Sequence, residues 1–333
     1  MPTVLERLNL ALQHVMETDE RVHLLGEDIL DPYGGAFKVT RGLSSRFPER
    51  VLSTPISEAA IVGIGSGLAM RGLRPVVEIM FGDFVTLIAD QLINHASKFR
   101  WMYNDQVRVP LVVRTPMGGR RGYGPTHSQS LEKLFLGVPG LRVIAPNTLQ
   151  DPFALLTACI LQDEGPILFV EHKLLYTCPM LETGQGDLQD FHIETSGEPY
   201  PCSVLRFQAQ PRGQLTIAVY GYNFELARAV ALKLAYEYEI FAEIVLFSQL
   251  SPFDLPPFVE SVRQTGHLLT IEEGTRPLGW GAELTSQIVE QLPGIKIRRA
   301  AALNLPIANS KTLEDVILPS QDNIIQLALD LLQ

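Results

Sequence analysis

The chain has 333 residues, of which 46% are hydrophobic and 19% charged, so it holds enough apolar sequence for two folded domains. Its formal net charge of −10 at pH 7 argues against nucleic acid as the main partner. Its apolar runs fall short of the roughly 18–20 residues that cross a bilayer, and the amphipathic segment 1–16 does not resemble a secretory signal.

The cysteines and histidines limit the metal chemistry that the chain can support. Cys159, Cys178 and Cys202 are odd in number and form no CxxC pair, which argues against a disulfide framework and a cysteine zinc site. His95 and His172 lack metal-ligand spacing, and no HExxH sequence occurs, so no metal site is predicted on this chain. We therefore expect a protein of a reducing compartment, the cytoplasm.

The first half of the chain alternates strand-like apolar runs with helical stretches, which is typical of an α/β fold. The runs predicted to be strands cover residues 22–25, 74–79, 109–114, 142–145 and 166–171. The stretches predicted to be helical cover residues 57–71, 83–103, 130–136 and 152–162. Gly72 is expected to close the first of these helices.

Residues 182–213 are rich in Gly, Pro, Gln and other polar residues and are predicted to be irregular. In the α/β unit that follows, strands are expected at 215–220, 242–247, 267–272 and 295–299 and helices at 224–238, 256–264 and 281–291. The sequence thus predicts two doubly wound α/β domains, residues 1–183 and 214–333, joined by a linker at 184–213.

Glu58 is the first candidate for chemistry. It would begin a helix capped by Ser57, where the helix dipole stabilises any carboxylate. The residues that follow are small and apolar, so we expect this helix, including its first turn, to be buried all round. A buried carboxylate needs a partner, and a ring nitrogen of a bound ligand would serve. The structural and the functional interpretation of Glu58 both stay open at this point.

The same helix contains Gly63, Gly65 and Gly67, which could be mistaken for a dinucleotide-binding loop. The run lacks the GxGxxG spacing and lies inside a helical pattern rather than after a strand. Close packing of a neighbouring element against Gly63 and Gly67 is the better explanation.

His127 is the second candidate, because a glycine-rich loop leads from a predicted central strand to it. Ligands of open α/β sheets bind at the carboxyl ends of strands, so His127 is either a structural residue or a proton-transferring group. Arg120 and Arg121 would bind a carboxylate substrate or be solvated. Met80 and Phe84 follow another strand and are either core residues or a surface for a flat heterocycle.

Several short motifs, in order and at family spacing, resemble one known family. They are Gly26-Glu27-Asp28, Tyr33-Gly34-Gly35, Thr54-Pro55-Ile56-Ser57-Glu58, Gly72-Leu73-Arg74-Pro75, Asp90-Gln91, His127-Ser128-Gln129-Ser130, Pro139-Gly140-Leu141, Ser251-Pro252 and Gly281-Ala282-Glu283. Together they resemble the beta subunit of the thiamine-diphosphate-dependent 2-oxo acid dehydrogenases, the decarboxylating component of pyruvate and branched-chain complexes. The resemblance covers almost the whole chain and implies a thiamine pyrimidine-binding domain followed by a transketolase C-terminal-type domain.

The resemblance also implies roles for four residues. The glutamate matching Glu58 hydrogen-bonds the aminopyrimidine ring of the cofactor and favours the imino form, which deprotonates the thiazolium carbon. The histidine matching His127 faces the substrate and assists proton movement or acyl transfer to a lipoyl group. Met80 and Phe84 match positions that line the aminopyrimidine.

The family's alpha subunit supplies a Gly-Asp-Gly loop for the diphosphate and magnesium, and this chain contains no such sequence. The resemblance therefore implies an alpha partner, most simply in an α₂β₂ heterotetramer with the cofactor between two chains. Some members hold a structural potassium ion with backbone carbonyls near the stretch matching residues 159–165. A lipoyl acyltransferase is a further implied partner, although residues 305–310 depart from the family's proline- and aromatic-rich stretch in the domain that docks to it. No nucleic acid or membrane is implied.

The first functional prediction is a subunit that, with its alpha partner, decarboxylates a 2-oxo acid and transfers the acyl group to lipoamide. The alternative is the beta-like half of a transketolase-like or acyloin-forming thiamine enzyme of a biosynthetic pathway. The order Gly124-Pro125-Thr126-His127 is similar to transketolases and deoxyxylulose-phosphate synthases, whereas the following Ser-Gln-Ser favours the dehydrogenases. The presence of both Glu58 and His127 argues against a purely structural subunit. The identity of the 2-oxo acid stays open, because its pocket is shared with the partner chain.

Overall fold

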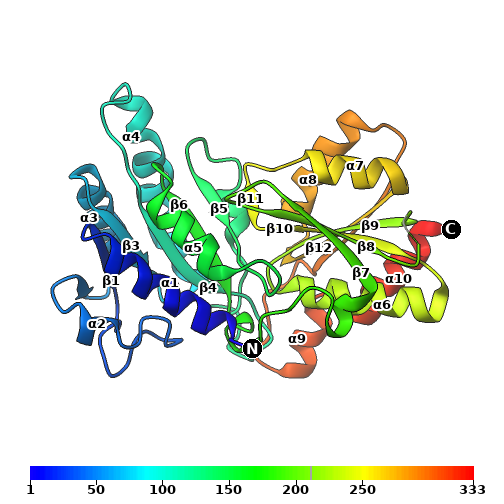
Figure 1. Cartoon of the computed structure of the whole chain (residues 1–333), viewed down its shortest axis with the longest axis horizontal. Coiled ribbons are helices and arrows are strands. Elements are labelled where there is room, and N and C mark those ends of the chain that lie inside the picture. The colour runs from blue at the N-terminus through cyan, green and yellow to red at the C-terminus, as the bar shows by residue number, and fades with distance from the viewer. Residues whose placement is uncertain (211) are drawn as a thin grey trace.

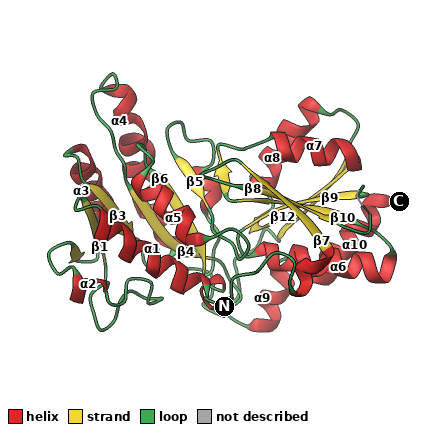
Figure 2. Cartoon of the chain, viewed as in Figure 1, coloured by secondary structure: helices red, strands yellow, loops and turns green. Residues whose placement is uncertain are grey.

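The computed structural model describes residues 1–210 and 212–333, which form two sheets with helices on both sides (Figure 1, Figure 2). The strands are β1 Val22–Gly26, β2 Val51–Ser53, β3 Arg74–Glu78, β4 Val112–Met117, β5 Arg142–Ile144, β6 Ile167–His172, β7 Phe191–Ser196, β8 Cys202–Phe207, β9 Leu215–Tyr220, β10 Ala242–Phe247, β11 Gln249–Ser251, β12 His267–Thr275 and β13 Lys296–Ala302. The α-helices are α1 Val4–Thr18, α2 Leu43–Arg46, α3 Glu58–Met70, α4 Ser97–Met102, α5 Pro152–Leu161, α6 Asn223–Tyr238, α7 Pro256–Thr265, α8 Trp280–Gln291, α9 Lys311–Ile317 and α10 Gln321–Leu332. Within the described ranges, no helix is both long and apolar enough to cross a membrane.

The first sheet has seven strands in the order β11-β5-β6-β4-β3-β1-β2. Strands β1 to β6 are parallel to one another, and β11 adds to β5 in antiparallel orientation. Neighbouring residues of a strand point to opposite faces, so Val76 packs in the core formed with α1 and α5 while Val77 packs in the core formed with α3. Both faces of the sheet are thereby covered, as a parallel sheet requires.

The second sheet has six strands in the order β13-β12-β9-β10-β8-β7. The first four are parallel, whereas β8 and β7 are antiparallel to their neighbours. Helices α6 and α10 cover one face and α7 and α8 the other. The core under α7 and α8 is continuous with the core under α3, so the two units, which lie side by side in Figure 1, share one hydrophobic interior.

Most predicted elements are found, and β9 and β10 have the predicted ends. The expected linker is wrong as a description of residues 184–213, because β7 and β8 lie in it and extend the second sheet. Strand β7 is the edge of that sheet and exposes most of its side chains, so its polar sequence does not show the alternation of a buried strand. The second sheet therefore begins before residue 214.

Two predicted helices differ in the structure. Residues 83–103 are helical but not one α-helix: a 3-10 segment Gly82–Ile88 and a π segment Gln91–Ala96 precede α4. The apolar pattern of a sequence indicates which face of a helix is buried. It does not indicate whether the turns are closed by the hydrogen bonds of a 3-10, an α or a π helix. The helix expected at 130–136 is only the 3-10 turn Glu132–Phe135, since Gly137 leaves it with a φ of +73°.

Helix α3 also corrects the sequence analysis. It is not buried all round, because Gly63, Ile64 and Gly67 are exposed. A Cβ atom at Gly63 or Gly67 would meet no described atom within 4 Å. The close approach is instead at Gly65, where a Cβ atom would lie 2.9 Å from Val77 Cγ2. The absence of a side chain at Gly65 therefore allows α3 to pack on β3.

Candidate functional site

Five neighbouring parallel strands, β2, β1, β3, β4 and β6, end along one edge of the first sheet. Ligands of open α/β sheets bind at such an edge. The segments that follow these strands carry, in the same order, Glu58, Glu27, Met80, the glycine-rich loop (residues 118–127) and Lys173. The sheet topology therefore places both predicted catalytic residues, Glu58 and His127, on one side of the domain.

Glu58 begins α3 and is 8% exposed, as its expected burial requires. The predicted cap is wrong in detail, because the Ser57 side chain makes no capping hydrogen bond. No hydrogen bond from the described residues reaches the Glu58 carboxylate. Glu27 is equally buried, and its Oε1 has no hydrogen-bond partner in residues 1–210 and 212–333. Burial and the nearby charge of Glu58 raise the pKa of Glu27. The structure thus brings together two largely buried carboxylates, of which Glu27 has one oxygen without a donor among the described residues.

His127 lies at the end of the glycine-rich loop, within an aromatic cluster. Its ring packs edge-on against Phe81 and Phe84, with centroid distances of 4.8 and 5.4 Å. Its Nδ1 atom is 3.0 Å from the hydroxyl oxygen of Thr126. This contact orients the ring and leaves Nε2 for a ligand. Phe84 is therefore beside His127, whereas Met80 is half-buried one residue before Phe81.

Two buried carboxylates of the second domain hold the glycine-rich loop. Glu273 of β12 accepts a hydrogen bond from the Gly119 backbone N–H at 2.7 Å. Glu314 of α9 accepts from the backbone N–H groups of Arg120 at 2.6 Å and Gly122 at 3.3 Å. Their residual exposures are 3% and 0%. The loop that carries His127 is thus built by the first domain and fixed by the second.

The two arginines of the loop have different surroundings. Arg120 donates from Nε to Glu273 at 3.2 Å and from Nη2 to the Pro319 carbonyl at 2.6 Å, so it joins the domains rather than facing solvent. Arg121 is exposed, and its guanidinium lies 5.9 Å from the centroid of the Phe37 ring. Of the two arginines, Arg121 alone is exposed enough to be solvated or to bind a carboxylate ligand, as the sequence predicted.

A buried ion network lies beneath this edge of the sheet. Arg114 of β4 donates to both carboxylate oxygens of Glu171 at 2.8 Å and to Glu78 at 2.9 Å. The Tyr176 hydroxyl donates to Glu171 at 2.6 Å. Such a bidentate pair fixes three neighbouring strands in register, because each partner would be costly to leave alone in the interior.

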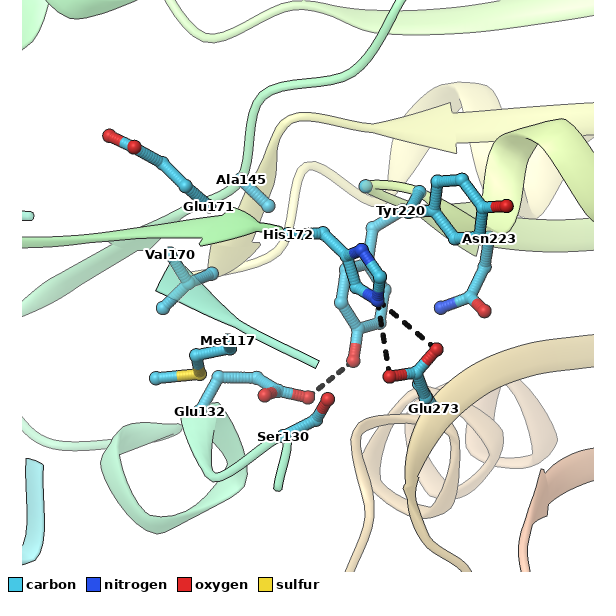
Figure 3. A pocket seen from close by; sticks show the side chains of 12 residues that line it. Met117, Ser130, Glu132, Ala145, Val170, Glu171, His172, Tyr220, Asn223 and Glu273 are labelled. Carbon is cyan, nitrogen blue, oxygen red and sulfur yellow. Dashed lines mark hydrogen bonds and ion pairs between the residues drawn. The ribbon is translucent and has the colours of Figure 1, made fainter. Parts of the chain in front are cut away.

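A small pocket lies between the domains and contains His172, Glu273, Glu132 and Tyr220 (Figure 3). His172 Nε2 is 3.1 and 3.2 Å from the two oxygens of Glu273, and the Tyr220 hydroxyl donates to Glu132. Although burial opposes it, His172, Arg120 and the Gly119 N–H lower the pKa of Glu273 to about 2. The cavity volume of about 30 Å³ has room for roughly one water molecule, and its lining residues connect the two domains.

Sequence reasoning gave no role to Glu27, which it named only within a motif, and it missed Lys173, Glu273 and Glu314. Glu27 and Lys173 had a signal, since each directly follows the end of a strand at the ligand-binding edge. Glu273 and Glu314 had none, because they act on residues 154 and 194 positions away in the chain. In the described ranges no cluster of three or more His, Cys, Asp or Glu residues could hold a metal ion.

Comparison with known proteins agrees with this geometry. The profile of the transketolase pyrimidine-binding domain matches residues 1–179, and that of the transketolase C-terminal domain matches residues 207–324. The pyruvate dehydrogenase E1 component subunit beta-1, mitochondrial, of Arabidopsis thaliana is 35% identical over 97% of this chain and 87% of that protein. The pyruvate dehydrogenase E1 component subunit beta of Rickettsia bellii is 32% identical over 97% of this chain and 96% of that protein.

Another relative is named for a different activity. The acetoin:2,6-dichlorophenolindophenol oxidoreductase subunit beta of Cupriavidus necator is 34% identical over 95% of this chain and 93% of that protein. Among solved structures, one described as "Split gene transketolase, inactive beta4 tetramer" has a TM-score of 0.74 at 18% identity, covers 99% of this chain and 98% of that one, and so supports the fold. The chain belongs to the beta subunits of the thiamine-diphosphate-dependent 2-oxo acid dehydrogenases, within the transketolase-like proteins. It is a subunit of an enzyme.

Proposed function

We propose that this chain, together with an alpha subunit, decarboxylates a 2-oxo acid on thiamine diphosphate and passes the acyl group to lipoamide. The observation that supports this most directly is the placement of Glu58 and of the His127 loop at the carboxyl ends of neighbouring parallel strands. A buried carboxylate and an imidazole on one sheet edge are suited to proton transfer on a ligand held between them.

The residues at this edge fit the aminopyrimidine part of the cofactor. The Glu58 carboxylate is buried and receives no donor from the described part of the chain, and Glu27 Oε1 beside it is unpaired. A ring nitrogen that carries a proton, as in the imino form, and an exocyclic amino group provide the donors that such carboxylates need. Phe84, with Met80 near it, offers the apolar surface on which a flat heterocycle packs.

Each residue then has a definite part. Thiamine diphosphate, when bound, supplies the carbon nucleophile and the electron sink for decarboxylation. Glu58 holds a proton shared with the ring nitrogen, and its burial strengthens that hydrogen bond. His127, oriented through Nδ1 by Thr126, takes up or delivers a proton at Nε2. The aromatic rings of Phe81 and Phe84 pack against His127 and limit its movement, while the imidazole itself stays half-buried.

The alpha subunit should supply the magnesium ligands and complete an α₂β₂ heterotetramer. The two sequences most similar to Gly-Asp-Gly contain Asp83 and Asp187. Asp83 Oδ1 already accepts two hydrogen bonds from Gln129 and its Oδ2 is buried, and Asp187 pairs with Arg228, so neither presents a carboxylate ready for the ion. Large apolar side chains are exposed far from the core, among them Ile56, Trp101 and Leu278, at 83%, 89% and 87%. A partner chain that covered these side chains would remove their apolar surface from water.

Three finer assignments belong to the same proposal. A lipoyl acyltransferase is the expected second partner, and neither nucleic acid nor a membrane surface has a part. A structural potassium ion near residues 159–165 would share carbonyl groups with Arg74, whose Nη1 already donates to Ile160 and Asp163 at 2.8 and 2.9 Å. The cytoplasmic assignment is supported by the three cysteines, which are free.

The test is reconstitution with the alpha chain that co-purifies from native cells. Calorimetric titration with thiamine diphosphate and magnesium should give weak binding to this chain alone and tight binding after the partner is added. Release of CO₂ should then be measured with pyruvate and with branched-chain 2-oxo acids. Because one relative is named for acetoin, which has no carboxylate to lose, consumption of acetoin should be measured separately. Turnover of acetoin alone would favour the acyloin-handling alternative. Tight, magnesium-dependent binding by the isolated chain would overturn the divided site.

A further inference from the structure

Lys173 occupies an unusual place for a lysine. It follows the last residue of β6, and its backbone N–H donates to the Met117 carbonyl at 3.1 Å. Met117 is the residue from which the glycine-rich loop leaves β4. The backbone of Lys173 is therefore fixed to the strand that begins the His127 loop, and its side chain is 0% exposed.

The buried ammonium contacts the parts of the molecule that position His127. Its Nζ donates a hydrogen bond to the backbone carbonyl of His127. It also lies over two aromatic rings, 5.2 Å from the centroid of Phe81 and 5.5 Å from that of Tyr123. Phe81 is the ring on which the His127 imidazole packs, and Tyr123 belongs to the loop. One cation thus joins the backbone, the packing surface and the loop of His127.

A structural reason alone does not account for a cation here. Burying an ammonium group is costly unless several partners compensate it. A methionine of similar length would fill the same space between two aromatic rings at a lower cost. What a methionine could not do is donate a hydrogen bond to the His127 carbonyl.

We infer that Lys173 is a positioning residue, whose ammonium group holds His127 at the place where proton transfer occurs. This inference rests on the proposed function, in which His127 moves the proton. A positioning role is expected to matter, because a misplacement of about 1 Å can cost on the order of 10²-fold in rate. Lys173 itself need not touch the substrate or the cofactor.

The charge of Lys173 is set by groups from four elements around it. The charged groups that act on it are Asp83 of the 3-10 segment, Glu273 of β12, Glu314 of α9 and Arg121 of the loop. Burial, aided by Arg121 and opposed by the three carboxylates, lowers the pKa of Lys173 to about 8. The cation is present below this pH and is lost above it, so the alignment of His127 should weaken as the pH rises through about 8.

The experiment compares Lys173→Met with wild type and with Lys133→Met in the reconstituted enzyme. Lys133 is a matched control, because its Nζ also donates to two backbone carbonyls, Thr275 and Pro277, away from His127. We expect Lys173→Met to lower kcat by about 10- to 100-fold with KM changed by less than about 3-fold. We also expect wild-type kcat to fall as the pH rises above about 8. This fall should be absent in Lys173→Met and present in Lys133→Met. An unchanged kcat, or an unchanged alkaline fall, would overturn the inference.

Two further measurements keep the result interpretable. Trypsin cleavage after Arg120 and Arg121, located by mass spectrometry on the full chain, should be faster in Lys173→Met than in either comparison protein. This readout needs no turnover, so it separates a failed inference from a failed proposed function. If Lys173→Met does not fold, Arg121→Gln provides the test: loss of the neighbouring positive charge should raise the pKa of Lys173 and move the alkaline fall of kcat to higher pH. An unmoved alkaline fall would contradict the role of Lys173.

Discussion

Two pairs of buried carboxylates in this molecule have the same chemistry and opposite surroundings. Glu27 and Glu58 lie at the carboxyl ends of the strands of the first sheet. There, among the described residues, Glu27 Oε1 is unpaired and no donor reaches Glu58. Glu273 and Glu314 lie between the domains, where each accepts at least two hydrogen bonds. The contrast extends to the pKa values, since that of Glu27 is raised and that of Glu273 is lowered to about 2.

The difference separates what this chain completes by itself from what it leaves to a ligand or partner. A buried carboxylate with all its donors stabilises the fold, whereas one without donors weakens it until a donor binds. The interdomain pair therefore acts as scaffold for the His127 loop, and the pair at the sheet edge is suited to binding. Substitutions of Glu273 and Glu314 should therefore mainly affect stability, and the substitution of Glu58 should mainly affect activity.

The largest effect is expected from Glu58→Gln. Neutralising this carboxylate should lower turnover of the reconstituted enzyme by about 10⁴-fold, the upper end for an acid–base group, while folding is kept. The direct measurement is deuterium exchange at the thiazolium carbon of the bound cofactor, which should become slow. Exchange at the wild-type rate would show that Glu58 does not activate the cofactor. The claim that the carboxylates at the strand ends serve activity rather than stability would then be wrong.

His127→Ala should have the next largest effect. Removing the imidazole should lower kcat by roughly 10²–10³-fold, with little change in the affinity for thiamine diphosphate. The affinity can be measured by calorimetric titration of the assembled enzyme with the cofactor. A variant that lost the affinity and kept its rate at saturation would show that His127 is a binding residue.

Much of this arrangement was predictable from local sequence, and the exceptions have a common cause. Glu58 and His127 were proposed as site residues because a helix start and a strand end are local patterns, and the structure shows that both lie where parallel strands end. The β7 edge strand was missed because its exposed side chains follow no buried alternation. Glu273 and Glu314 were missed because they serve a loop more than 150 residues away in the chain. Local patterns predict elements, and they do not predict which distant charge completes a loop.

Glu273→Gln tests whether the charge of Glu273 stabilises the fold, through the dependence of stability on pH. The pKa of Glu273 is depressed from 4.5 to about 2, so its contribution to stability is present above about pH 4.5 and is lost as the pH falls towards 2. The depression corresponds to roughly 3 kcal/mol. Urea unfolding should show Glu273→Gln less stable than wild type by about this amount at pH 7, with the gap closing in acid. A gap that is constant with pH would mean that the charge is not responsible.

Glu314→Gln should have a smaller effect on stability and a local one on the loop. The amide keeps one oxygen acceptor but places an N–H group opposite a backbone donor, which should cost roughly 1–3 kcal/mol. Asp315→Asn is the matched control, because Asp315 is the exposed neighbour and pairs with Lys311 at the surface. Hydrogen exchange of the Arg120 and Gly122 amides should rise in Glu314→Gln alone. Equal exchange in both variants would show that α9 does not hold the loop.

The smallest expected effect has the opposite sign. Glu27→Gln removes a buried charge that lacks a donor on Oε1 and lies near Glu58. Because the pKa of Glu27 is raised in the folded chain, wild-type stability falls as the pH rises through the range where this group ionises. The variant should therefore be more stable than wild type by about 0.5 kcal/mol at pH 7, and the two should converge below about pH 4.5. Urea midpoints at pH 7 and pH 4 measure this difference. If Glu27→Gln were instead destabilised at pH 7, as expected for Glu273→Gln, the carboxylates at the sheet edge would be scaffold as well, and the division between the two pairs would be wrong.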